Sequence, residues 1–178
     1  SLFFLNFVGE VHALEINSTK INDYKFEKHR LYIPTNNLKN DAENKILILY
    51  SGDYNHNGVG LHQYIDPSDK KEYLYTQFEP YDCNRLLPCF DQPDIKAILT
   101  LKVIAPKEWI VLANAPEKSI TDFSDENQLT QFNYSEDSIK HLVKNYEIKN
   151  KNHQIYIFDD TLVYQLIYMQ YVLVHIIV

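Results

Sequence analysis

The chain has 178 residues, enough for one domain whose hydrophobic core needs no disulfide bridges. Hydrophobic residues make up 45% and charged residues 23%, which is typical of a globular protein. The net charge of -7 excludes a nucleic-acid partner from our expectations, because phosphate binding needs a basic face. Two cysteines, Cys83 and Cys89, are too few for a disulfide framework and cannot form a zinc site by themselves.

Short apolar and aromatic runs, separated by turn-forming residues, recur along the chain and indicate β-strands. The 14 Tyr and 9 Phe favour this interpretation, because aromatic side chains pack well on a pleated surface. We predict strands at residues 2–7, 11–16, 25–33, 45–50, 72–78, 95–104, 110–114, 128–134 and 154–158.

Helical signals are few. The polar connection 36–44 could carry one helical turn, and only residues 135–144 give a weak helical pattern. We therefore predict a mainly β fold, an antiparallel β-sandwich formed by residues 1–160. Residues 161–178 form an apolar tail that we do not count as a domain.

Two polar residues in the predicted strand 72–78 and just after it are candidates for binding. Gln77 and Glu79 lie two apart, so on a strand their side chains project from the same face. An amide and a carboxylate on one face could hold an ammonium group and an adjacent carbonyl. Such a pair is, however, more often the solvated side of a strand.

A Pro-rich segment with several charges follows. A bend there could bring Arg85 onto either of two carboxylates, Asp82 or Asp91, although such pairs are more often structural. Cys89 is expected to be buried rather than nucleophilic. The seven His residues are scattered without helical i, i+4 spacing, so we assign no metal site and no catalytic residue.

The amino-acid sequences of two motifs point to a family. Residues 73–80 read YLYTQFEP and residues 88–93 read PCFDQP, with Gly58 to Pro67 before them and Lys96-Ala97 after them. At this spacing the chain closely resembles the aminopeptidase N family of zinc peptidases, of the bacterial cytosolic type. The resemblance covers roughly residues 2–160.

The resemblance implies a fold and a role. In that family, a saddle-like N-terminal β-sandwich domain leans over a thermolysin-like catalytic domain. The residue that matches Gln77 lines the pocket for the first substrate side chain, and the residue that matches Glu79 helps to grip the free α-amine. Arg85, Asp91 and Pro93 belong to the motif that shapes the following loop.

The catalytic motifs of the family are not present in this sequence. It contains no H-E-x-x-H, and its one methionine, Met169, precedes Gln170 rather than the Glu-Asn of a Gly-x-Met-Glu-Asn loop. We therefore expect an N-terminal fragment, lacking the first strands of the family, that is inactive alone. Zinc, peptide N-termini as substrates and the missing catalytic domain are expected only for the intact cytoplasmic enzyme.

The tail, TLVYQLIYMQYVLVHIIV, departs abruptly from the family. A transmembrane helix, a buried strand pair and a frameshift are three interpretations of it. Shifted by one base, residues 161–175 and the start of Ile176 can encode PRISTYLYAICAGPYH, which continues the family's pattern. Because Met169 has a single codon, the Ala of Tyr-Ala is forced. We therefore expect a frameshift near codon 161.

Two other functions remain as alternatives. The first is a free-standing β-sandwich module that binds peptides without catalysis, and affinity for peptides with free N-termini would favour it. The second is a protein anchored in a membrane by its apolar C-terminal stretch.

Overall fold

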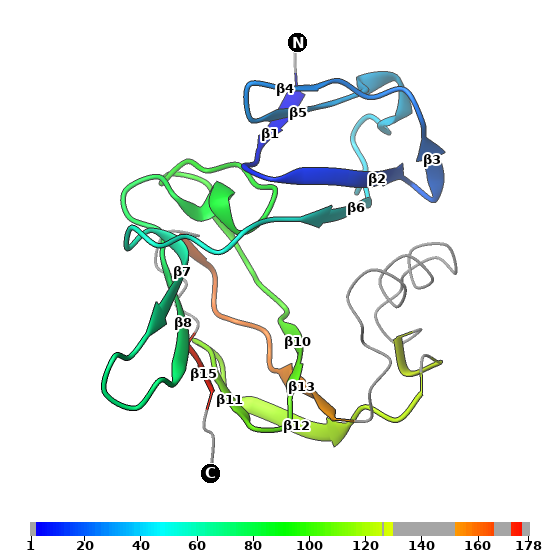
Figure 1. The fold of residues 1–178 in the computed structure, drawn as a ribbon. Coiled ribbons are helices and arrows are strands. Elements are labelled where there is room, and N and C mark those ends of the chain that lie inside the picture. The colour runs from blue at the N-terminus through cyan, green and yellow to red at the C-terminus, as the bar shows by residue number, and fades with distance from the viewer. Residues whose placement is uncertain (1–2, 126, 130–151, 166–171, 176–178) are drawn as a thin grey trace. The chain divides into compact units, whose positions relative to one another are not determined.

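The computed structural model describes residues 3–125, 127–129, 152–165 and 172–175. These residues form a mainly β structure with antiparallel strand ladders, as predicted, and their helical segments are single 3-10 turns (Figure 1). The chain divides into two compact units. The first comprises Ser1–His62, Thr76–Lys96 and Gln165–Tyr168, and the second comprises Gln63–Tyr75, Ala97–Tyr164 and Met169–Val178.

The first unit contains two three-stranded antiparallel sheets. In one, β1 (Phe3–Asn6) pairs with β5 (Arg30–Ile33), which pairs with β4 (Phe26–Glu27). In the other, β2 (Glu10–Ile16) lies between β3 (Thr19–Ile21) and β6 (Ile46–Ser51).

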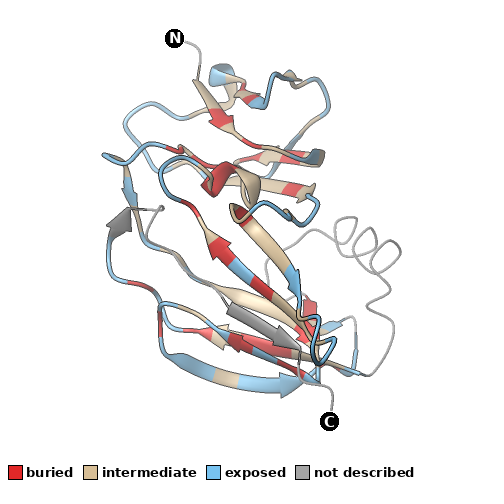
Figure 2. Ribbon diagram, turned by 60° about the vertical axis from the view of Figure 1, so that its left-hand side comes forward, coloured by how far each residue is buried: buried red, intermediate tan, exposed pale blue. Residues whose placement is uncertain are grey.

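The core of the first unit is built from alternate residues of these strands. On β2, the side chains of Leu14 and Ile16 are fully buried, whereas the intervening Glu15 is partly exposed. This alternation is the two-residue period that the sequence showed at 11–16. The two sheets share one cluster of buried side chains, formed by Leu5, Leu14, Ile16, Leu31 and Ile33 (Figure 2).

Two tight hairpins in this unit use left-handed backbone conformations. Asn17 and Ser18 join β2 to β3 with φ of 52° and 66°. Lys28 and His29 join β4 to β5 with φ of 51° and 60°. Positive φ at both central residues is the geometry of a two-residue turn that suits the twist of the flanking strands.

The second of these hairpins corrects our prediction of a single strand at 25–33. Lys28-His29 contains no Gly, Asn or Asp, so local residue preference predicts no turn there. The turn is held from outside, because the backbone N–H of Phe7 donates to the carbonyl oxygen of His29 at 3.0 Å. A tertiary hydrogen bond thus supports a turn that local preference does not.

The second unit also contains antiparallel sheets. In one, β13 (His153–Phe158) lies between β10 (Lys102–Pro106) and β12 (Glu117–Asp122). Its core includes the fully buried Leu129 and Ile155 together with Phe123. Another sheet has the strand order β11-β15-β8-β7, with β11 at Trp109–Leu112, β15 at Val172–His175, β8 at Glu72–Gln77 and β7 at Gly60–Ile65.

Several predicted elements differ from the observed ones. The predicted strand 95–104 is interrupted, since β9 covers only Lys96–Ala97 before β10 begins. Residues 127–129 form a helical turn rather than the start of a strand at 128–134. The polar connection near residue 36 contains the 3-10 turn Thr35–Asn37. The remainder of 128–134 and the weak helical pattern at 135–144 lie outside the described residues.

The apolar tail contributes strands where it is described. Tyr164–Gln165 forms β14, and Val172–His175 forms β15, which pairs with both β11 and β8. Within the described residues, no helix is long and apolar enough to cross a membrane.

Candidate functional site

The candidate binding residues lie at the end of β8. Gln77 is the last residue of that strand and is partly exposed, whereas its neighbours Thr76 and Phe78 are buried. Alternation along a strand therefore directs the Gln77 side chain to the opposite face from Thr76. The ordered strand thus carries one of the two predicted binding residues.

Glu79 lies beyond the strand, in the turn that follows it. Its side chain is exposed, and its peptide bond to Pro80 is cis. Glu79 therefore lies outside the strand, and a face shared by the two side chains remains a prediction. The carboxylate makes no hydrogen bond or ion pair with another described residue and can accept one from a ligand.

Asp91 anchors the loop between residues 81 and 91. Its carboxylate is only 1% exposed, and its Oδ2 accepts hydrogen bonds from the backbone N (2.9 Å) and the side-chain Nδ2 (2.6 Å) of Asn84. Its other oxygen, Oδ1, is buried without a hydrogen-bond partner among the described residues. Asp91 therefore has a structural role in closing this loop.

Arg85 pairs with Asp82, not with Asp91. Its Nε lies 2.5 Å from Asp82 Oδ1, across one 3-10 turn, η2 (Cys83–Arg85). Gly60 lies against Arg85, because a Cβ at Gly60 would approach the Arg85 Cβ to 2.7 Å. Of the two carboxylates that the sequence offered as partners of Arg85, the one that pairs with it is therefore Asp82, the closer in sequence.

Pro93 lies in an exposed turn after this loop, where Ile95 N donates to the carbonyl oxygen of Gln92 at 3.1 Å. The five predicted residues thus fall into two groups. Gln77 and Glu79 present polar groups near the end of β8, while Arg85, Asp91 and Pro93 shape the connection that follows.

The two cysteines do not form a reactive centre. Both are free and buried. The side-chain hydrogen bond between Cys89 and Cys83, together with burial, raises the pKa of Cys89 well above its usual range. A thiol held in its neutral form is a poor nucleophile. Among the described residues, no group of three His, Cys, Asp or Glu side chains could hold a metal ion.

Asn84 was not among the predicted site residues, yet it makes several hydrogen bonds in this loop. Besides its bonds to Asp91, its carbonyl oxygen accepts a hydrogen bond from Val8 N at 2.8 Å. In a Pro-rich segment, asparagine is a common turn residue, so the local sequence does not distinguish Asn84 from an Asn without a structural role. Its position directly before Arg85, a residue of the loop motif, is the signal that could have marked it.

The family follows from comparison with known proteins. Residues 3–138 match the family model described as the peptidase M1 N-terminal domain. The chain belongs to the M1 peptidase family. The resemblance predicted from the two motifs is therefore confirmed, and the match includes all five predicted site residues.

Individual M1 relatives agree with this assignment. Aminopeptidase N of Streptomyces lividans is 35% identical over 107 residues, which are 60% of this chain and 12% of that protein. Aminopeptidase N of Acetobacter pasteurianus is 33% identical over 115 residues, 63% of this chain and 32% of that protein. The chain therefore spans a minor part of the M1 proteins that it matches.

The fold also matches a solved M1 structure. The crystal structure of an M1 zinc metallopeptidase from Deinococcus radiodurans aligns with a TM-score of 0.67 and 13% sequence identity, over 98% of this chain and 34% of that one. At this identity the match supports the fold, which agrees with the predicted mainly β, antiparallel class.

Proposed function

We propose that this chain is the substrate-recognition part of a zinc-dependent aminopeptidase that removes N-terminal residues from peptides. The M1 match over residues 3–138 carries the proposal. Within it, Glu79 presents an exposed carboxylate after β8 and Gln77 a partly exposed amide at its end. Glu79 would accept a charge-assisted hydrogen bond from the substrate α-amine, and Gln77 would contact the first side chain.

The hydrolytic step belongs to residues outside this chain. Zinc in such an enzyme activates a water molecule and polarises the scissile carbonyl. No set of described side chains here fits zinc, so this chain's part is to bind and orient the peptide N-terminus. The protein is accordingly proposed to be inactive alone. Two free thiols suit a reducing compartment, so we place the intact enzyme in the cytoplasm.

The proposal is tested with a longer protein. It is encoded by the gene after one base is restored near codon 161, so that this domain precedes the expected catalytic domain. Glu79→Gln should lower kcat/KM for an aminoacyl-anilide substrate by about 10- to 100-fold, the range expected for loss of one hydrogen bond to a charged group. Glu10→Gln, which changes the same chemical group at an exposed position on β2, is the matched control and should leave kcat/KM unchanged. Equal effects of the two substitutions would refute a role for Glu79.

A second arm uses the 178-residue chain alone. Titration with a short C-terminally amidated peptide that has a free N-terminus, and with its N-acetylated form, should give no measurable binding to either, because half of the amine pocket and the metal are missing. Affinity for the free peptide only, lost in Glu79→Ala, would favour the non-catalytic binding module instead.

A further inference from the structure

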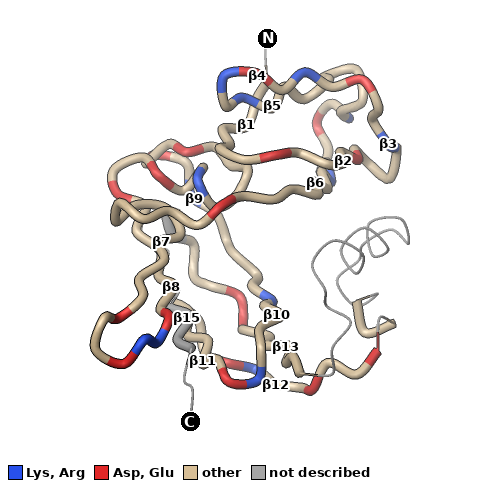
Figure 3. The backbone as a smooth tube through the Cα atoms, in the orientation of Figure 1, with Lys and Arg blue, Asp and Glu red and all other residues tan. Residues whose placement is uncertain are grey.

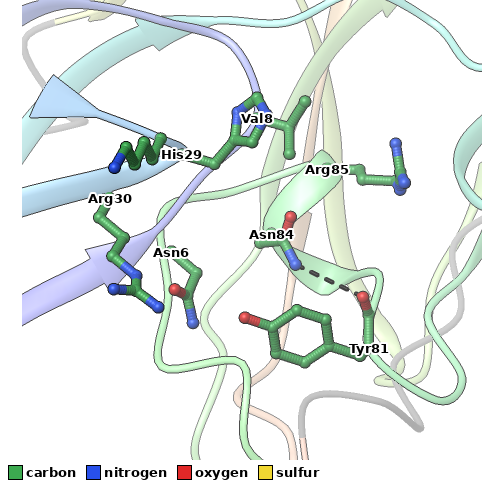
Figure 4. Close-up of a pocket in the computed structure, with 8 residues that line it drawn as sticks. Asn6, Val8, His29, Arg30, Tyr81, Asn84 and Arg85 are labelled. Carbon is green, nitrogen blue, oxygen red and sulfur yellow. Dashed lines mark hydrogen bonds between the residues drawn. The ribbon is translucent and has the colours of Figure 1, made fainter.

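A cavity on the first unit has a lining that lies mostly outside the motifs of the M1 resemblance. It encloses about 320 Å³ and is bordered by Asn6, Val8, Lys28, His29, Arg30, Tyr81, Asn84 and Arg85 (Figure 4). Three of these residues are Lys or Arg, in a chain whose net charge is -7. The lining contains no Asp or Glu, so the cavity concentrates hydrogen-bond donors and positive charge.

The cavity is assembled from three segments by backbone hydrogen bonds to 6–8. The β4–β5 hairpin is held through Phe7 N to the carbonyl of His29 (3.0 Å), and η2 through Val8 N to the carbonyl of Asn84 (2.8 Å). Asn6 N donates to the carbonyl of Cys89 at 2.8 Å. These bonds fix the walls before any ligand arrives, which lowers the entropic cost of binding.

Two donors lie side by side on one wall. Asn6 and Arg30 are directly paired residues of β1 and β5, so their side chains project from the same face of the sheet. Figure 4 shows the Asn6 amide and the Arg30 guanidinium extending in the same direction. The guanidinium carbon lies 4.8 Å from the centre of the Phe4 ring. Stacking uses the face of the guanidinium and leaves its in-plane N–H groups available to a ligand.

Tyr81 supplies a further donor from the opposite wall. Figure 4 shows its hydroxyl directed toward the side of the cavity where Asn6 lies. Partial burial raises the pKa of Tyr81, although the positive charge of Arg30 opposes this shift. The hydroxyl is therefore protonated at neutral pH and can donate a hydrogen bond.

Two nearby carboxylates are already paired with cations, Glu27 with Lys25 at 2.7 Å and Asp82 with Arg85. The buried Asp91 accepts hydrogen bonds only from neutral N–H groups of Asn84, and its negative charge contributes to the raised pKa of Tyr81. Lys28 and Arg30 make no ion pair with another described residue. Figure 3 shows basic residues on the β4–β5 hairpin, with an acidic residue among them. The positive charge of the cavity wall is thus not neutralised within the described part of the unit.

We propose that this cavity binds a small oxyanion, a carboxylate or a phosphate group, through Arg30, Asn6 and Tyr81, with Lys28 supplying a second positive charge. A guanidinium fork matches two oxygens of either group, and the neighbouring amide and hydroxyl complete the set of donors. The proposed ligand is an anion, whereas Glu79 is proposed to bind an ammonium group, so either proposal can fail without the other.

The test is an NMR titration of the full chain with two probes, inorganic phosphate and N-acetylglycine, at constant ionic strength maintained with chloride. N-acetylglycine has a carboxylate and no free amine. We expect saturable amide shifts confined to the cavity residues with at least one probe. Saturation by phosphate alone or by N-acetylglycine alone identifies which source of oxyanion the cavity accepts.

Substitutions connect the shifts to the cavity. Arg30→Gln should weaken binding by about tenfold or more, and Arg30→Lys should restore only part of it because the fork is lost. Lys28→Gln removes a charge from an exposed turn and should weaken binding even if Arg30→Gln does not fold. Lys20→Gln, the same change on β3 away from the cavity, is the matched control and should have no effect. The absence of saturable shifts with both probes, or equal weakening in Lys20→Gln, would overturn the proposal.

Discussion

Single buried polar residues hold the irregular parts of this protein in place. Asn84 bonds to Asp91 through both its backbone N–H and its side-chain amide, and to Val8 through its carbonyl oxygen. In the second unit, Tyr156 is 5% exposed and its hydroxyl donates to the carbonyl oxygen of Trp109 at 2.7 Å. Such groups matter because a buried donor or acceptor that loses its partner loses hydrogen bonding to water as well.

Tyr156→Phe should therefore destabilise the protein by about 1–2 kcal/mol, since the ring remains and only the hydrogen bond is lost. Urea unfolding followed by the fluorescence of Trp109, the single tryptophan, measures this change in the second unit. Tyr64→Phe, at a side chain that is 45% exposed on β7, is the control and should change stability by less than about 0.5 kcal/mol. Equal unfolding free energies for Tyr156→Phe and wild type would contradict the prediction.

The same substitution has a pH signature. Burial, and next the negative charge of Glu117, raise the pKa of Tyr156 above the ordinary tyrosine value of 10.0. Above that pH the unfolded chain loses the phenolic proton before the folded protein does. The stability that this tyrosine contributes is therefore complete below pH 10 and is lost as the pH rises through the folded-state pKa. The difference in unfolding free energy between wild type and Tyr156→Phe should shrink above pH 10.

At the scale of elements, each strand is stabilised by what its buried face packs against. The central strand of one sheet in the first unit, β2, places Leu14 and Ile16 in the cluster shared by both sheets. The edge strands β3 and β4 have three and two residues and contribute mainly to closing hairpins. The regular alternation of β2 was readable from sequence because one face is buried, whereas these short edges carry too few residues to show a period.

Leu14→Ala should destabilise the first unit by about 2–5 kcal/mol, because the side chain is fully buried and its removal leaves a cavity. Hydrogen exchange at the amides of Ile48 and Leu49, which lie on the paired strand β6, measures the stability of that unit directly. Leu112→Ala, at a side chain that is 55% exposed on β11, should leave those rates unchanged. A change below about 1 kcal/mol for Leu14→Ala would show that the cluster is not a stabilising core.

At the scale of the whole molecule, the apolar tail is the segment whose origin matters most. Val172–His175 pairs with β11 and β8 in the structure, and apolar β-branched residues suit such a position by composition alone. Pairing of this kind does not require that the segment was selected for it. We therefore keep the proposal that residues 161–178 arise from a frameshift.

The nucleotide sequence of the locus tests this proposal. Loss of one base near codon 161 predicts that another frame continues into Ser-Thr-Tyr-Leu, then Gly-x-Met-Glu-Asn and H-E-x-x-H. Restoring that base should then give a protein with zinc-dependent aminopeptidase activity, removed by a chelator and recovered with zinc. A downstream sequence with none of these motifs in any frame would contradict both the frameshift and the missing catalytic domain.

The sequence alone determined the family, the mainly β class and the candidate residues Gln77 and Glu79, because motifs and two-residue periodicity are local properties of the chain. Tertiary structure decided the rest. A backbone hydrogen bond from Phe7 supports the turn at residues 28–29. Arg85 pairs with Asp82. Asn6, Arg30 and Tyr81 come together in one cavity. The hairpin and the cavity depend on backbone hydrogen bonds between distant segments, and no local pattern encodes which segments will meet. The pairing of Arg85 with Asp82 depends on the 3-10 turn that brings these two side chains together.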